Sequence, residues 1–135
     1  MKEIKVSAKI ENVSIVTDFV NEELEKNDAS MKSVMQIDIA IDEIFSNIAN
    51  YAYDEIEGEA VISIDITENR EAVLSFKDSG KYYNPLEKED PDVTLSADER
   101  DIGGLGIFLV KKSMDNIDYE YKNNCNILTI KKSIC

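Results

Sequence analysis

Residues 37–52 read IDIAIDEIFSNIANYA, and the apolar side chains in this stretch recur every three or four positions. Such spacing is typical of a helix that buries one stripe of its surface in a core. The stripe comprises Ile37, Ile41, Ile44, Phe45, Ile48 and Ala52. Ser30 precedes it and can cap a helix, because its hydroxyl accepts a hydrogen bond from an unpaired backbone N–H group. The pattern therefore predicts a long amphipathic helix that begins after Ser30 and ends near Tyr53.

A strand and a shorter helix are expected before this long helix. Apolar and polar residues alternate from Ile4 to Ile10, which puts one face of an opening strand against the core. Asn12 is a candidate N-cap, and apolar residues at helical spacing follow it to about Lys26.

Two antiparallel hairpins are expected after the long helix. The first has its turn at residues 68–71, and its second strand carries Ala72, Leu74, Phe76 and Asp78 on one face. Asp78 therefore lies in line with the core. The second hairpin pairs residues 117–121 with 127–130 around the turn Lys122-Asn123-Asn124 and closes the chain.

A long polar segment separates the two hairpins. It runs from Gly80 to Asp101 and contains Pro85 and Pro91, so we interpret it as a mobile loop, and its length favours a functional lid. Gly103, Gly104 and Gly106 then open a helix. The order of elements lacks regular β-α-β alternation, which predicts an α+β fold: one domain over residues 1–135, a two-layer sandwich with a mixed, mostly antiparallel sheet and helices on one face.

Composition excludes several classes of function. The 135 residues include 28 Asp and Glu but only 15 Lys and Arg, a net charge of -13, which disfavours binding to nucleic acid or an anionic membrane. The absence of histidine excludes serine–histidine and cysteine–histidine catalysis and zinc–histidine sites. Cys125 and Cys135 are expected to be reduced thiols. No apolar run is long enough to span a bilayer, and the first residues lack the pattern of a secretory signal, so we expect a cytoplasmic protein.

The first candidate site lies on the long helix. Glu43, Asn47 and Asn50 fall within about 60° of one another around the helix axis, away from the apolar stripe. A solvated polar face is the alternative interpretation. A carboxamide oxygen can bind Mg²⁺ and a nearby carboxylate can accept a hydroxyl proton, so the pair suits phosphoryl transfer.

The second candidate site is Asp78-Ser79-Gly80. A carboxylate on the apolar face of a strand requires a hydrogen-bond partner, and the amino group of adenine could supply one beside Gly80, where a flat ring can approach the backbone. The alternative is an Asp-Ser-Gly turn in which Asp78 bonds its own downstream N–H groups.

The third candidate site is the glycine cluster at the start of the last helix. N–H groups at a helix start attract anions, and Gly103, Gly104 and Gly106 would let phosphate oxygens come close. The alternative is a flexible hinge for the lid.

Together the three sites resemble, in order and context, the N box, G1 box and G2 box of the Bergerat-fold ATPases, the superfamily of gyrase and histidine kinases. Residues 42–47 (DEIFSN), 84–86 (NPL) and 104–107 (GLGI) look most like those of the bacterial anti-sigma-factor serine kinases. The resemblance covers nearly the whole chain.

This resemblance implies roles for individual residues. Glu43 would be the catalytic base, Asn47 the Mg²⁺ ligand and Asp78 the acceptor for the adenine amino group. The other residues expected to contact ATP are Asn50, Gly80, Gly103, Gly104 and Gly106, with Arg100 as a candidate for the γ-phosphate or, alternatively, a solvated side chain.

The resemblance also implies partners. Members of that family sequester a sigma factor and phosphorylate a serine on an anti-anti-sigma antagonist, and they are expected to dimerise. Two other functions stay open from the sequence: an ATP-binding interaction module without kinase activity, and a detached sensor-kinase domain that transfers phosphate to a histidine on another chain.

Overall fold

One sheet of five antiparallel strands forms one layer of the computed structural model, which describes residues 1–53, 57–87 and 102–135. The strands are β1 (Lys2–Ser7), β2 (Glu59–Ile66), β3 (Glu71–Asp78), β4 (Asn116–Lys122) and β5 (Cys125–Ser133), in the spatial order β1-β2-β3-β5-β4. All four neighbouring pairs in the described sheet are antiparallel, so the parallel pairing that a mixed sheet would need is not found there.

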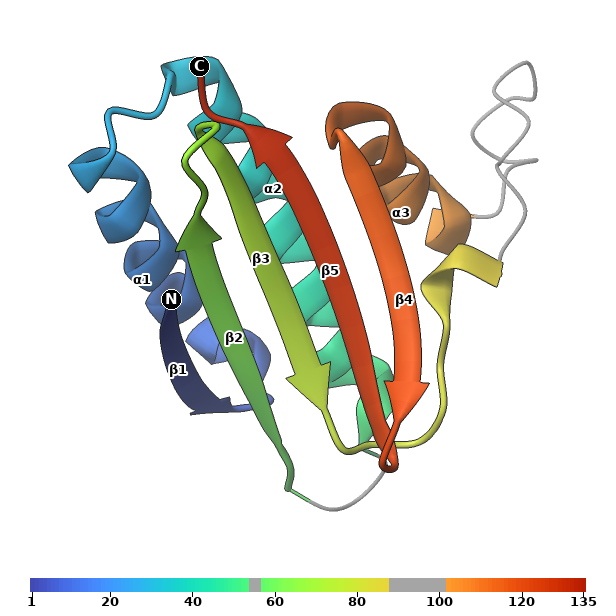
Figure 1. Cartoon of the computed structure of the whole chain (residues 1–135). Helices are drawn as coiled ribbons and strands as arrows, with labels where there is room; N and C mark the ends of the chain where they lie inside the picture. The colour runs from blue at the N-terminus through green and yellow to red at the C-terminus, as the bar shows by residue number, and fades with distance from the viewer. Residues whose placement is uncertain (54–56, 88–101) are drawn as a thin grey trace.

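Helices cover one face of this sheet (Figure 1). They are α1 (Val13–Lys26), α2 (Met31–Asn47) and α3 (Ile102–Ser113). Short turns of other helix types complete the described chain: η1 (Ile10–Asn12), the π-helical η2 (Ile48–Ala52) that extends α2, and η3 (Pro85–Glu87). The predicted two-layer α+β sandwich is confirmed. None of the helices in the described residues is long and apolar enough to cross a membrane.

The core lies between α2 and the centre of the sheet. All six residues of the predicted helical stripe are buried. They pack in one cluster with inward-facing residues of β2 and β3, among them Ile62, Ile64, Leu74 and Phe76. Each large apolar side chain buried in this way contributes about 1.5–3 kcal/mol. The apolar stripe of α2 and the inward-facing apolar residues of β2 and β3 are therefore buried in the same core.

The N-terminal prediction was partly wrong. β1 ends at Ser7, and Ile10 lies in η1 with half its surface exposed instead of continuing the strand. Asn12 stands at the N-cap of α1 but makes no capping bond, because its side-chain amide donates to the backbone oxygen of Ser7 instead. Ser30 does cap α2, accepting from the N–H group of Ser33 at 3.2 Å.

Both predicted hairpins are present, and the second has a tight turn. Asn123 and Asn124 have φ angles of 55° and 63°, the left-handed conformation that a two-residue hairpin turn requires. Of the predicted loop from Gly80 to Asp101, the structure describes residues 80–87, which include η3. Residues 88–101, with Pro91 and Arg100, lie outside the described residues.

Gly80 packs the segment after β3 against the end of η2. A Cβ atom at this position would lie 2.1 Å from the backbone carbonyl oxygen of Ala52, and the same oxygen accepts a hydrogen bond from the N–H group of Lys81. The glycine is therefore required by close backbone packing, a reason different from the approach of a flat ring that the sequence suggested.

Replacing Gly80 with alanine is expected to destabilise the fold by about 1–3 kcal/mol, because backbone atoms must move to admit the methyl group. Urea denaturation followed by circular dichroism measures this change. Ser79→Ala is the control, since that neighbouring residue is exposed. Equal stability of the wild type and Gly80→Ala would contradict the packing argument.

Candidate nucleotide-binding site

A cavity opens at the end of the sheet where β3 ends and β5 begins. It is small, with a volume of about 30 Å³, and its mouth is open to solvent. Residues of α2, η2, the last three strands and the segment after β3 line it: Ile44, Asn47, Ile48, Ala52, Phe76, Asp78, Tyr83, Pro85, Tyr119, Asn126 and Leu128. Most of its wall is apolar or aromatic, as expected for a site that binds a flat heterocycle.

Asp78 supplies the charged group of this cavity. Its Oδ1 atom accepts two hydrogen bonds of 2.9 Å, from the N–H group of Gly80 and from Nδ2 of Asn126. In the described residues its Oδ2 atom has no hydrogen-bond partner. The carboxylate is 5% exposed, and burial raises its pKa, although the bonds from Asn126 and Gly80 oppose the shift. Asp78 thus closes the predicted turn with one oxygen and leaves the other as an acceptor.

Asn126 is a site residue that the sequence reasoning missed. The register of β3 and β5 places it opposite Asp78, and it is 6% exposed. It is the polar member of an inward-facing series that continues with Leu128 and Ile130. That departure from the alternation is the same feature that drew attention to Asp78, and it could have identified Asn126.

Glu43 and Asn47 lie together one turn apart on α2. Nδ2 of Asn47 donates to Oε1 of Glu43 at 3.4 Å, and both side chains are half-buried. Asn47 also lines the cavity, together with Ile44 and Ile48 of the apolar stripe. Asn47 therefore borders the cavity, and Glu43 is half-buried beside it, so these two residues are not the fully solvated face of the alternative interpretation. Asn50 lies in η2 and is exposed, outside the cavity lining.

Gly106 brings α3 against the Glu43 carboxylate. A Cβ atom at residue 106 would lie 2.2 Å from Cδ of Glu43 and 2.3 and 2.4 Å from its two oxygens. A glycine is thus what allows the carboxylate to reach the helix backbone. Gly103 and Gly104 lie in the first turn of α3, as the sequence predicts.

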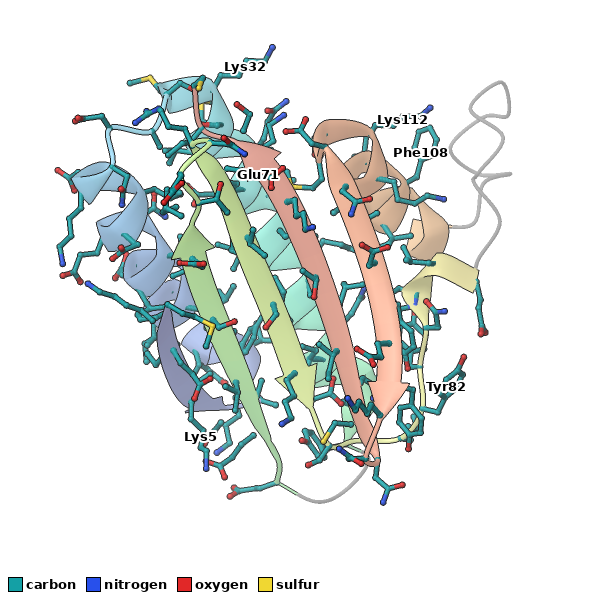
Figure 2. All side chains as sticks on the ribbon, viewed as in Figure 1. Lys5, Lys32, Glu71, Tyr82, Phe108 and Lys112 are labelled. Atoms are coloured by element: carbon teal, nitrogen blue, oxygen red, sulfur yellow. The ribbon has the colours of Figure 1, made fainter. Side chains whose placement is uncertain are left out.

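Aromatic side chains form the outer rim of the site. Tyr82 lies beside β4 at the lower right of Figure 2. Its ring makes edge contacts with Tyr119 and Tyr121, and its hydroxyl donates to Glu87. Burial and the nearby Tyr82 and Asp78 raise the pKa of Tyr119 to about 12, so its hydroxyl keeps its proton at neutral pH.

No group of three or more acidic, cysteine or histidine side chains that could hold a metal occurs in the described residues. Mg²⁺ does not require such a group, because it is commonly held by one or two protein oxygens together with phosphate oxygens and water. The Asn47 amide is suited to this role because its nitrogen donates to Glu43 and its oxygen accepts no hydrogen bond from the described residues.

The fold and the site define a class. A helix-covered antiparallel sheet, with an acid–amide pair on α2 against a glycine-rich α3 and a buried aspartate at the end of β3, is the arrangement of the Bergerat-type domains. The chain belongs to the histidine kinase-like ATPase domain family, which matches residues 6–132.

Curated relatives support a more specific likeness. The chain is 28% identical over 133 residues to the serine-protein kinase RsbW of Bacillus thuringiensis (strain Al Hakam), covering 96% of this chain and 82% of that protein. The serine-protein kinase RsbW of Bacillus anthracis gives the same values. The predicted resemblance to bacterial serine kinases is confirmed by these matches.

Solved structures confirm the fold. The structure of the RsbU and RsbW domains of Rv1364c from Mycobacterium tuberculosis superposes with a TM-score of 0.68 at 15% identity, covering 99% of this chain and 33% of that one. The histidine kinase AdeS of Acinetobacter baumannii gives a TM-score of 0.55 at 12% identity, covering 99% of this chain and 69% of that one.

Proposed function

We propose that this protein is an ATP- and Mg²⁺-dependent protein serine kinase. The observation that carries the proposal is that Asn47 lines the same cavity as Asp78 while it donates a hydrogen bond to Glu43. Asn47 therefore connects the apolar cavity, which contains the Asp78 carboxylate, to the Glu43 carboxylate one turn away on α2. Glu43 is the proposed general base.

The cavity would hold the adenine ring of ATP, with Oδ2 of Asp78 accepting from the exocyclic amino group. The phosphates would extend toward the N-terminal turn of α3, where N–H groups at a helix start attract an anion and Gly103, Gly104 and Gly106 have no side chains to keep phosphate oxygens away. Asn47 would contribute the protein ligand to Mg²⁺, which neutralises charge on the phosphate oxygens.

The chemical step transfers the γ-phosphoryl group to a serine. Glu43 accepts the hydroxyl proton as the serine oxygen forms a bond to the γ-phosphorus, and the bond from that phosphorus to the β,γ-bridging oxygen breaks to release ADP. The main contributions of the protein are orientation of the two substrates and removal of the proton. Arg100, which lies outside the described residues, is proposed as a further contact to the γ-phosphate.

We also propose the partners that the family resemblance implies: a sigma factor that the protein sequesters in the cytoplasm, and an antagonist whose serine it phosphorylates. The net charge of -13 favours protein partners with basic surfaces over nucleic acid. A homodimer is the proposed assembly.

Incubation of the purified chain with an antagonist protein and γ-labelled ATP tests the activity. Acid-stable label on a serine of the antagonist is the expected result. Nucleotide binding without transfer would instead favour an interaction module, and acid-labile label on a histidine would favour a sensor-kinase domain. Failure to bind ATP with Mg²⁺ at millimolar concentration would reject the proposal.

Replacing Gly106 with alanine is expected to slow phosphate transfer without destabilising the protein. The new Cβ atom would meet the end of the Glu43 side chain, which can rotate away, so the carboxylate moves and the backbone does not. Misplacing a catalytic group by about 1 Å can slow a reaction about 100-fold. Alanine also favours a helix interior over glycine by about 0.8–1 kcal/mol, so stability should be equal or higher.

Transfer rates and urea denaturation of the same preparation test this expectation. Leu109→Ala, on the exposed face of α3, serves as the control. An unstable Gly106→Ala variant with normal transfer would contradict the assigned contact.

A further inference from the structure

We propose that Asn126 is a positioning residue that fixes Asp78 and thereby makes the cavity select a 6-aminopurine over a 6-oxopurine. This inference rests on the proposed nucleotide-binding function and names the group that sets its base specificity. It starts from the hydrogen bonds of a buried amide that contributes nothing to the apolar core.

The orientation of the Asn126 amide is fully determined by its neighbours. Its Oδ1 atom accepts from the N–H group of Tyr83 at 3.1 Å and from the hydroxyl of Tyr119. Its Nδ2 atom donates to Oδ1 of Asp78 and to the backbone oxygen of Lys81, both at 2.9 Å. A side-chain amide has two donor hydrogens and two acceptor positions, and all four are used here. Flipping the amide would therefore place donor against donor at the Tyr83 N–H group and acceptor against acceptor at Asp78 and Lys81, and only the Tyr119 hydroxyl could adapt by accepting.

The fixed amide in turn fixes the carboxylate. Oδ1 of Asp78 accepts from Asn126 and Gly80, and rotation of the carboxylate would break both bonds in a buried site. The cavity therefore presents only Oδ2 as an acceptor. Without Asn126, the carboxylate would be held by the Gly80 N–H group alone and could turn.

This arrangement distinguishes two classes of purine. An exocyclic amino group at position 6 donates to Oδ2, whereas a 6-oxo group would bring a second oxygen against it. Sites that hydrogen-bond one substrate group strongly reject the analogue that lacks it, because the buried partner is left unpaired. ATP and inosine triphosphate, which differ at position 6 in this way, are therefore the probes to compare.

Calorimetric affinities of the full chain for ATP and for inosine triphosphate, with Mg²⁺, test the inference. We expect the wild type to prefer ATP by at least about 100-fold, the ratio that about 3 kcal/mol provides. Asn126→Ala is expected to weaken ATP binding at least tenfold while leaving inosine triphosphate almost unaffected, so that the ratio falls. If the variant bound both nucleotides more weakly by the same factor, Asn126 would have only a structural role, and the inference would be overturned.

Asn126→Asp is the isosteric second variant, useful if Asn126→Ala fails to fold. Its added carboxyl group would face Oδ1 of Asp78, so the two carboxyl groups would share one proton. Binding of ATP to this variant should then fall more steeply with rising pH than binding to the wild type, because the shared proton leaves. Tyr119, from β4, and Tyr83 are the titratable side chains of the described residues that line the cavity with Asp78, and the pKa of Tyr119 of about 12 keeps that residue protonated throughout.

The outcomes separate this inference from the function on which it depends. The positioning role is overturned if the ATP affinity of Asn126→Asp has the same pH dependence as that of the wild type. It is also overturned if Asn126→Ala keeps the wild-type ratio of ATP affinity to inosine triphosphate affinity. Either result leaves ATP binding by the wild type intact. A wild type that binds neither nucleotide rejects the proposed function and the inference with it.

Discussion

Asp78→Asn is expected to lose ATP affinity by at least about 100-fold while folding at least as stably as the wild type. Asparagine keeps an oxygen that accepts from Gly80 and Asn126, so the turn and the link to β5 survive. Its Nδ2 atom then replaces the free Oδ2 and would direct a donor at the donor of adenine. Loss of a charge-assisted hydrogen bond together with this donor–donor contact amounts to about 3 kcal/mol.

The stability of this variant follows from the raised pKa of Asp78. Because the folded pKa lies above the ordinary value of 3.8, the folded protein holds the proton more tightly than the unfolded chain. The stabilisation that Asp78 gives through this proton is complete below pH 3.8 and is lost as the pH rises through the folded pKa. Asparagine is neutral at every pH, so the stability advantage of the variant should grow from acid to neutral pH and then level.

Calorimetric titration with ATP measures the loss of affinity. Urea denaturation between pH 3.5 and 7.5 measures the change in stability. Asp118→Asn, an exposed carboxylate on β4, makes the same change of charge and should alter neither. If Asp78→Asn bound ATP normally, Asp78 would serve only to close the turn with Gly80.

Glu43→Gln is expected to reduce phosphate transfer by about 10²–10⁴-fold, the usual contribution of a general base, with ATP affinity changed only slightly. Glutamine has the same shape and can still accept from Asn47 and pack against Gly106, but it cannot take up the serine proton. The variant therefore removes the chemistry and leaves the structure of the α2–α3 contact in place.

Single-turnover transfer to the antagonist, with ATP affinity measured separately, checks this prediction. Asp42→Asn is the matched control, because Asp42 is the adjacent carboxylate on α2 and is exposed. Intact transfer by Glu43→Gln would eliminate Glu43 as the base, and Glu43→Ala should agree with it.

Several elements could be predicted because their signals are local. The period of α2, the alternation in β2 and β3 and the Asn123-Asn124 turn each depend on neighbours a few residues away. Ile10 was wrongly placed in a strand because alternation continues in the sequence after β1 has lost its partner. The last residue of β1 that pairs with β2 is Ser7, opposite Glu59.

The contacts that make a site were less predictable. The acid–amide pair on α2 follows from helical geometry, since Glu43 and Asn47 are one turn apart. The approach of Gly106 to Glu43 joins two helices whose packing no local pattern specifies. The role of Gly80 was likewise set by the backbone of Ala52.

The sequence by itself determined that a carboxylate would lie in the core at the end of a strand, because side chains alternate between the two faces of a sheet. Only the tertiary structure decided which oxygen of Asp78 stays available. That choice depends on the register of β3 against β5, which places Asn126 opposite Asp78, and on Tyr119 of β4 and Tyr83 after β3, which both donate to the amide oxygen. Hydrogen bonds are short and directional, so partners distant in sequence can be assigned only once the strands are paired.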